Sequence, residues 1–504
     1  MNVNREASVA IIKCQNSNYP LPPFNPPVNY PEYPFKNSFL QEDNHVYHHV
    51  REMLFLLGLD KDNYNKPAWN PLKEIVHPGD RVILKPNLVI SEHKLGLKGI
   101  EAATVHGSLI RPFVDYTYIA LKGEGRITIG DSPIKEVDFE KIIEVLGITE
   151  MAKYLMSHYP NIPLEIIDFR DLKAWRKQNG IIFKTESLPG DKRGYSIIDL
   201  KNKSLFHEIV QHHKRFRSTA AVYENVMNEV HNLVNHKYSF SNTVLEADAF
   251  ISLCKLKTHR KTGVTLSLKN MVGLTNEKRW LPHHRIGSIS EGGDSIPDKA
   301  NISEISAHKL HDFFQKHKYG KIGLSFILPA IKFGYNNFIK YIIKYFDKNT
   351  PIGWSAGDWY GNDTVWRMVL DLNQILFYSD KNGEMREKPQ KRYFSCVDGV
   401  IAGEKDGPLN PSPKSTGLII GGFNPVSVDL ACIKLMGFDY KKIPLMWGVD
   451  KVVNPLFDST GIDTLWRQLK IVSNYHEFTQ LIDDNKLFYQ FEPSDGWKGH
   501  IEHE

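Results

Sequence analysis

The chain has 504 residues, of which 41% are hydrophobic and 24% are charged. This composition is typical of a globular protein that is long enough for two or three domains. The net charge of +5 and the pI of about 8.6 are too small to predict nucleic-acid binding, which requires a concentrated basic surface. We therefore expect no nucleic-acid partner.

The cysteines and the apolar runs exclude other classes. No CxxC motif occurs among the four cysteines, so neither a zinc knuckle nor an iron–sulfur cluster is expected. The first residues lack the pattern of a signal peptide, and no uninterrupted apolar run reaches the ~18 residues of a membrane span. We expect a cytoplasmic protein with reduced thiols and no transmembrane segment.

The first half of the chain alternates predicted strands and helices. Apolar runs predict strands at residues 8–14, 80–84, 125–129 and 164–168, and helical periodicity predicts helices at 45–57 and 108–122. Residues 171–242 are polar, and we interpret them as an irregular excursion with one amphipathic helix near 220–234.

The second half continues this alternation. We expect strands at 249–253, 393–397 and 415–420, and helices at 265–271, 301–316, 364–378 and 425–436. A loop at 403–408 with glycine hinges is predicted to expose Glu404 and Asp406. The pattern predicts an α/β fold with a mixed or mostly parallel sheet, helices on both faces, and two lobes with a cleft between them.

The domain boundaries follow the changes in composition. We assign residues 1–300 to an N-terminal α/β lobe, 301–380 to a helical insertion, and 381–504 to a C-terminal α/β segment that completes the site. Residues 321–346 combine lysines with large apolar and aromatic side chains. Such a segment either lies on a membrane surface or packs against another domain, and both interpretations stay open.

A basic stretch directly follows the predicted strand at 249–253. Lys255, Lys257, His259 and Lys261 alternate, so an extended backbone places all four on one face. Concentrated positive charge is costly unless an anion or a carboxylate compensates it. The stretch is therefore either a ligand site or a solvated basic loop. In an open α/β sheet, the carboxyl ends of the strands are the usual place for a ligand.

A second group of polar residues follows the strand predicted at 125–129. Pro133 suits the first position of a helix, and either Asp131 or Ser132 could cap it. Free amides at that helix start, beside Lys85, would bind an anion. The alternative is a simple turn.

If these strand ends meet in one crevice, each group has a candidate role. The candidates for proton transfer are His259, Asp131 and Glu404. An anionic substrate would contact cations, amides and a hydroxyl: Lys85, Asn87, Ser132, Lys255, Lys257, Lys269 and Asn270. A divalent metal, if one is bound, would take His283, His284 and Asp406, with either histidine as the ligand.

Several of these segments also resemble a known family. The chain resembles domain-of-unknown-function family 362 in an ordered series of motifs across residues 8–440: VILKPNL (82–88), IGDSP (129–133), KLKTH (255–259), LKNM (268–271), VDG (397–399), GEKDGP (403–408) and NPVSVD (424–429). Some members carry a ferredoxin-like cysteine cluster, which this chain lacks. The family is distantly similar to nickel-pincer lactate racemases, although no cofactor-tethering lysine or racemase histidine pair aligns here.

Three functional hypotheses follow. The first is an enzyme with a cationic, histidine-containing cleft, with or without a divalent metal, that isomerises or epimerises a small anionic metabolite. The second is a binding protein for a phosphorylated or metal-chelating ligand. The third is a peripheral membrane protein or complex subunit that docks through residues 321–346. The oligomeric state is not indicated by the sequence.

Overall fold

The computed structural model describes residues 6–35, 39–159, 161, 163–176, 182–219, 225–298, 357–452, 461–482 and 489–503. The segments predicted as a helix at 301–316 and as a membrane or domain contact at 321–346 lie outside these residues. No helix in the described ranges has both the length and the apolar character needed to cross a bilayer.

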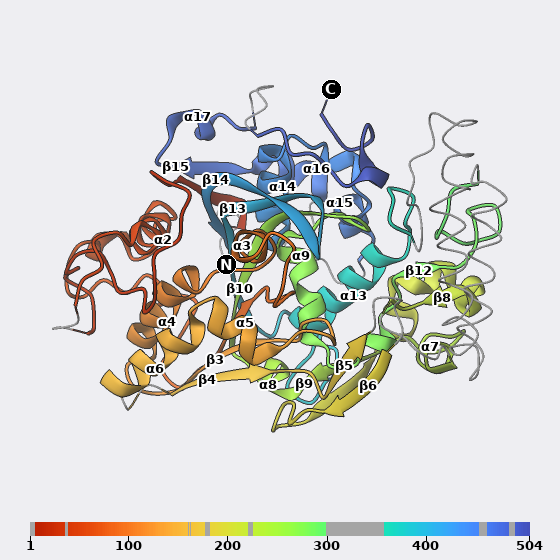
Figure 1. Cartoon of the computed structure of the whole chain (residues 1–504), viewed down its shortest axis with the longest axis horizontal. Coiled ribbons are helices and arrows are strands. Elements are labelled where there is room, and N and C mark those ends of the chain that lie inside the picture. The colour runs from red at the N-terminus through yellow and green to blue at the C-terminus, as the bar shows by residue number, and fades with distance from the viewer. Residues whose placement is uncertain are drawn as a thin grey trace.

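One large sheet organises the molecule (Figure 1). Its strands lie in the order β15 (Lys470–Ser473), β1 (Ser8–Lys13), β14 (Asn410–Gly422), β13 (Arg392–Asp406), β10 (Ala249–His259), β2 (Arg81–Pro86), β3 (Arg126–Asp131) and β4 (Leu164–Asp168). The short β11 (Gly263–Val264) pairs with the end of β10. Strands from the first and last parts of the chain therefore share this sheet.

The strands from β13 to β4 run parallel, whereas β14 is antiparallel to both of its neighbours. The sheet is thus mixed and mostly parallel, as the sequence predicted. From β2 the chain proceeds to β3 and β4 on one side, and later strands add on the other side through β10. The boundary between β2 and β10 is therefore a topological switch point, where α/β proteins bind their ligands.

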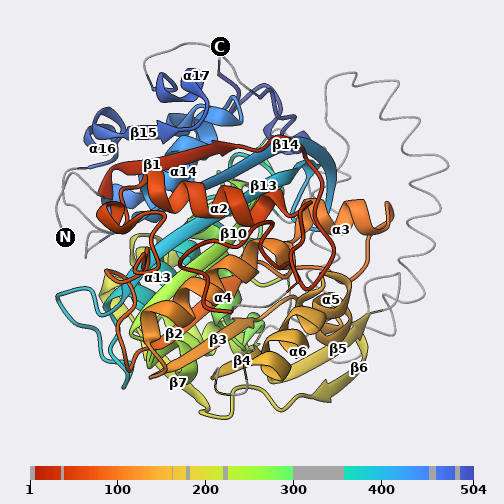
Figure 2. The same cartoon turned by 90° about the vertical axis from the view of Figure 1, so that its left-hand side faces the viewer.

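Helices cover both faces of the sheet, which confirms the predicted α/β class (Figures 1 and 2). One face packs against α2 (His45–Leu56), α4 (Gly107–Leu121), α5 (Phe139–Val145) and α6 (Ile148–His158). The other packs against α9 (Leu266–Asn270), α13 (Val365–Tyr378) and α14 (Pro425–Leu435). This arrangement does not test the two-lobe cleft or the domain boundaries, so both stay predictions.

The excursion at 171–242 is more regular than expected. It contains an antiparallel pair, β5 (Leu172–Arg176) with β6 (Ile182–Ser187), and a second pair, β7 (Tyr195–Asp199) with β9 (Lys237–Ser241). Its helix, α7, spans Asn225–Val230. These strands pair with each other across loops, and this pairing was not evident in the local sequence.

Two local predictions were wrong. Residues 403–406 form the end of β13, where Glu404 pairs with Ser412, so they are not a hinged loop. No helix starts at Pro133, because the next helix is α5, capped by Asp138. The Asp131 carboxylate instead accepts the amide of Leu88 at 2.7 Å, which joins the ends of β2 and β3.

Candidate functional site

A cavity of about 580 Å³ opens at the carboxyl ends of β2, β3 and β10, at the switch point of the sheet. Eight of the predicted site residues line it: Asn87, Asp131, Ser132, Lys257, His259, Lys269, Asn270 and His283. They come from four separate segments of the chain. The structure therefore gathers distant residues around one cavity.

A buried ion pair lies beside this cavity. The Nζ atom of Lys85 lies 2.7 Å from Oδ1 of Asp131, and both side chains are almost fully buried. Lys85 also donates to Oδ1 of Asn270 at 2.9 Å and to the Pro86 carbonyl at 3.0 Å. All three of its donors are thus used, and Lys85 is not among the lining residues. We interpret this pair as part of the framework that fixes the strand ends.

Three other lysines line the cavity and differ from Lys85 in their charge partners. Lys257, Lys269 and Lys278 are buried, and no carboxylate forms an ion pair with any of them among the residues the structure describes. Lys257 donates to neutral oxygens, including Oδ1 of Asn87 at 3.1 Å, and Lys278 donates to the Val272 carbonyl at 2.7 Å. Buried ammonium groups without a counter-charge are costly, so the cavity is poised to accept negative charge.

The pKa values of these lysines reflect the same environment. Burial lowers the pKa of Lys278 to about 7 and that of Lys269 to about 8, and neighbouring lysines contribute to both shifts. Burial, together with Lys255 and Lys269, also lowers the pKa of Lys257 well below its ordinary value. An amine with a pKa near 7 can both accept and donate a proton at neutral pH.

The two histidines of the cavity differ in which ring nitrogen carries the hydrogen. Nδ1 of His259 accepts the Lys261 amide at 3.0 Å, so its proton resides on Nε2. Nδ1 of His283 lies 2.8 Å from the Leu281 carbonyl, which can only accept, so its Nε2 carries the lone pair. Burial lowers the pKa of both rings, that of His283 to about 3, and both are therefore neutral. His259 offers a donor and His283 an acceptor.

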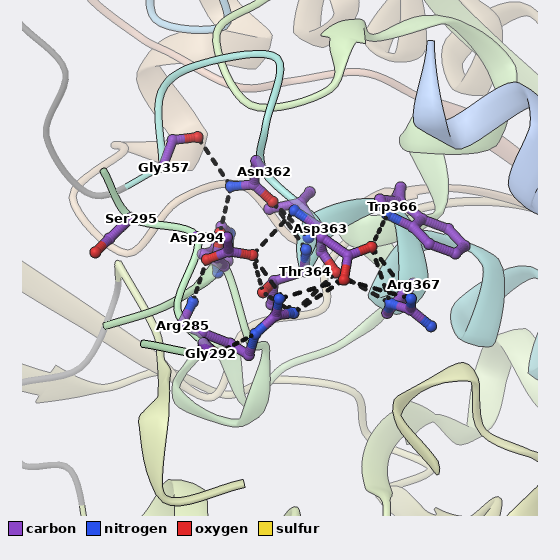
Figure 3. A network of polar contacts seen from close by, with 12 residues as sticks. Arg285, Gly292, Asp294, Ser295, Gly357, Asn362, Asp363, Thr364, Trp366 and Arg367 are labelled. Carbon is purple, nitrogen blue, oxygen red and sulfur yellow. Dashed lines mark hydrogen bonds and ion pairs between the residues drawn. The ribbon is translucent and has the colours of Figure 1, made fainter. Parts of the chain in front are cut away.

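A polar network around Asp294, Asn362 and Asp363 (Figure 3) also reaches the backbone at His283. Nδ2 of Asn362 donates to the His283 carbonyl at 3.0 Å and to the Gly357 carbonyl at 2.9 Å. The buried Asp294 carboxylate accepts the amide of Asp363 at 3.0 Å and lies 3.6 Å from the Arg285 guanidinium. The loop after α9 is thereby tied to the start of α13.

Five predicted site residues lie away from the cavity lining. Lys85 belongs to the framework described above. Lys255 pairs with Asp398 at 3.0 Å, with both side chains fully buried. Glu404 pairs with Lys414 at 2.8 Å, and Asp406 pairs with Arg260 at 2.9 Å. Their charges are compensated within the protein.

His284 is the fifth of these residues, and the proposed metal ligands do not come together. His284 lies on β12 (His284–Arg285), whereas His283 lines the cavity and Asp406 ends β13. The clusters of potential metal ligands found in the described ranges do not include any of these three residues. The structure therefore gives no geometric support to this metal set.

Two lysines that line the cavity were not among the predicted site residues. Lys278 lies on the turn Lys278–Trp280, and Lys135 pairs with Glu277 at 3.4 Å. Both occur in polar segments that look like ordinary solvated turns, so local sequence gave no signal for them. The acidic Asp358, which pairs with Lys261 at 2.9 Å, was missed for the same reason.

The family model for Domain of unknown function (DUF362) matches residues 177–434, just over half of the chain. The chain therefore belongs to this family, as its motifs indicated. No curated protein and no solved structure gives a match, so the similarity to lactate racemases is not shown. The matched region contains β10, α9 and the lysines 257, 269 and 278.

Proposed function

We propose that this protein is an enzyme that binds a small anionic metabolite in the switch-point cavity and transfers a proton to or from it. One observation carries the proposal: three buried lysines line the same cavity without a carboxylate partner in the described structure. A carboxylate or phosphate would supply the missing charge and strong, charge-assisted hydrogen bonds.

The lining groups have complementary roles in this proposal. Lys269 holds the anion as an ammonium ion, because its pKa of about 8 is higher than that of Lys278. Lys278, with a pKa of about 7, accepts and returns the proton. The Nε2 hydrogen of His259 donates to an oxygen on which charge develops. This division of roles suits an isomerase or epimerase acting next to a carboxylate.

The first experiment tests anion binding. A panel of hydroxycarboxylates, dicarboxylates, phosphate monoesters and inorganic phosphate is titrated into the full chain by calorimetry. Lys269→Met should weaken binding of the best ligand about 10- to 100-fold, because a hydrogen bond to a charged group contributes about 1.5–3 kcal/mol. Lys61→Met, on the exposed turn Lys61–Asn63, is the matched control and should bind like the wild type. Equal affinity in both variants would exclude the cavity as the binding site.

The second experiment tests proton transfer. The ligands that bind are incubated with the protein in D₂O, and NMR follows deuterium incorporation at the carbon next to the acid group. Lys278→Met should abolish incorporation while binding persists. Tight binding without incorporation by the wild type would favour the binding-protein hypothesis instead.

A cytoplasmic location is part of the proposal. All four cysteines are free and buried, which is the expected state in a reducing compartment. Fractionation of cells that express the tagged chain would test the location directly.

A further inference from the structure

Three potential metal ligands meet at the N-terminal part of the sheet, separate from the cavity lining. Cys14 directly follows β1, and His45 and His49 lie one turn apart on α2. The i, i+4 spacing places both imidazoles on one side of the helix. One ligand atom from each residue lies within 4.8 Å of the other two.

Hydrogen bonds fix the protons on both rings. Nε2 of His45 lies 2.8 Å from the Asn18 carbonyl, so Nε2 carries the hydrogen and Nδ1 the lone pair. Nδ1 of His49 lies 3.3 Å from a carboxylate oxygen of Glu52, which leaves the lone pair on Nε2. A carbonyl and a carboxylate are the usual outer partners of metal-bound histidines.

The two remaining ring nitrogens carry lone pairs that are buried. Nδ1 of His45 and Nε2 of His49 have no hydrogen-bond partner among the described residues. His49 is only 4% exposed and Cys14 only 5%, so water does not readily supply the missing bonds. Buried polar atoms are almost always satisfied, and an exception requires an explanation such as an ion.

We propose that the Sγ of Cys14, Nδ1 of His45 and Nε2 of His49 bind a divalent cation of the zinc class. Thiolate and imidazole ligands together suit zinc, which prefers tetrahedral coordination. Water or an exogenous ligand takes the fourth position. The Cys14 thiol loses its proton to solvent on binding, whereas both histidines coordinate in the tautomers they already have.

The site would connect the end of β1 to the first turns of α2. Burial and the nearby Asp398 raise the pKa of the Cys14 thiol, and burial lowers the pKa of His45. The two imidazoles coordinate through their free lone pairs, but the thiol must first be deprotonated. Binding should therefore strengthen as the pH rises.

A competing cluster shares His49 with the proposed site. His48, His49 and Glu52 also lie within metal-binding distance of one another. In this second cluster His48 is exposed, and its Nδ1 already contacts the Tyr30 hydroxyl at 2.9 Å. No thiol belongs to it, so cobalt spectroscopy distinguishes the two sites.

The test uses the full chain, treated with a chelator and then titrated with Co²⁺ and Zn²⁺. The wild type should bind Co²⁺ in equimolar amount, with a thiolate-to-cobalt charge-transfer band in the near ultraviolet. Cys14→Ser should lose this band, His49→Gln should lose binding, and His48→Gln should retain both. A wild type without the band, or a band that persists in Cys14→Ser, would overturn the proposal.

A measurement on the wild type alone guards against a variant that fails to fold. X-ray absorption of the zinc complex should show sulfur and imidazole scattering in the first shell, and zinc should raise the melting temperature. A first shell of oxygen and nitrogen only, or no zinc binding, would contradict the assignment independently of any substitution.

Discussion

Nζ of Lys255 lies 3.0 Å from Oδ2 of Asp398, whereas Lys257, two positions further along β10, has no carboxylate partner in the described ranges. Residues two positions apart on a strand point to the same face, so the sequence pattern gives both lysines the same predicted environment. Asp398 also accepts the Tyr19 hydroxyl at 2.7 Å and the His106 amide at 3.1 Å. Lys255 is thus part of a closed buried network, and Lys257 belongs to the open cavity.

This difference predicts distinct effects of two matched substitutions. Lys257→Met should weaken binding of the anionic ligand about 10-fold or more, because a charged donor is removed from the cavity. Lys255→Met should leave the affinity unchanged within error. Titration calorimetry at low temperature, where both variants stay folded, measures the two affinities. Equal losses in both variants would show that the strand acts as one basic surface.

Removing Asp398 should affect stability and not the ligand site. Asp398→Asn leaves the Lys255 ammonium buried without its counter-charge, which typically costs about 3–5 kcal/mol. The exposed Asp62→Asn should change stability by no more than about 0.5 kcal/mol. Urea unfolding followed by circular dichroism compares the two variants. A similar small effect in both would mean that water reaches the pair.

Lys278 should make stability depend on pH in the neutral to alkaline range. Its folded pKa of about 7 lies below the ordinary 10.5, so the unfolded chain binds more protons between these values. Stability therefore rises with pH through this window, because the cost of the buried charge disappears. Lys278→Met should be more stable than the wild type below pH 7, by up to about 3–5 kcal/mol.

The gain in Lys278→Met should shrink as the pH approaches 10.5. Unfolding midpoints in urea at a series of pH values test this, with the exposed Lys61→Met as the control that should follow the wild type. A saturating anion should reduce the advantage, because it stabilises the charged lysine. A constant difference between wild type and variant at all pH values would contradict the shift.

Gly273 leaves room for the framework ion pair. A Cβ atom at this position would lie 2.0 Å from Oδ1 of Asp131 and 2.5 Å from Nζ of Lys85. Gly273→Ala should therefore separate the pair, destabilise the protein by about 1–3 kcal/mol and weaken ligand binding. Gly123→Ala, at φ +87° with no atom within 4 Å, tests backbone strain alone. Gly123→Ala should lower the stability without any effect on ligand binding. The same unfolding and titration experiments measure both quantities.

The sequence predicted much of the fold but only part of the site. The apolar run at 249–253 was sufficient to place a strand, but β10 continues to His259 because Asp398 and neutral oxygens compensate its lysines. Those partners lie far away in the chain, so no local pattern shows them. Glu404 followed a glycine that suggested a hinge, yet pairing with β14 makes the segment a strand. Long-range pairing, and not local preference, decided both cases.

The same limit explains why Lys278 was missed. Its environment is created by Val272, by the cavity and by lysines on other elements, whereas its sequence neighbours are charged residues. Asp131 was correctly placed at the end of a strand, but its carboxylate bonds to Leu88 and Lys85 and caps no helix. The sequence shows the type of each residue and its position in an element, but it does not show which group its side chain contacts.

The final prediction concerns the two cavity histidines. His259 should be the Nε2–H tautomer and His283 the Nδ1–H tautomer, because one Nδ1 accepts an amide and the other faces a carbonyl. Burial lowers both pKa values, that of His283 to about 3, so neither ring should become charged between pH 5 and 9. Long-range ¹H–¹⁵N correlation on histidine-labelled protein reports the tautomers, with His259→Gln and His283→Gln for assignment. An imidazolium signal from either ring near pH 6 would contradict the division into one donor and one acceptor on which the proposed proton transfer depends.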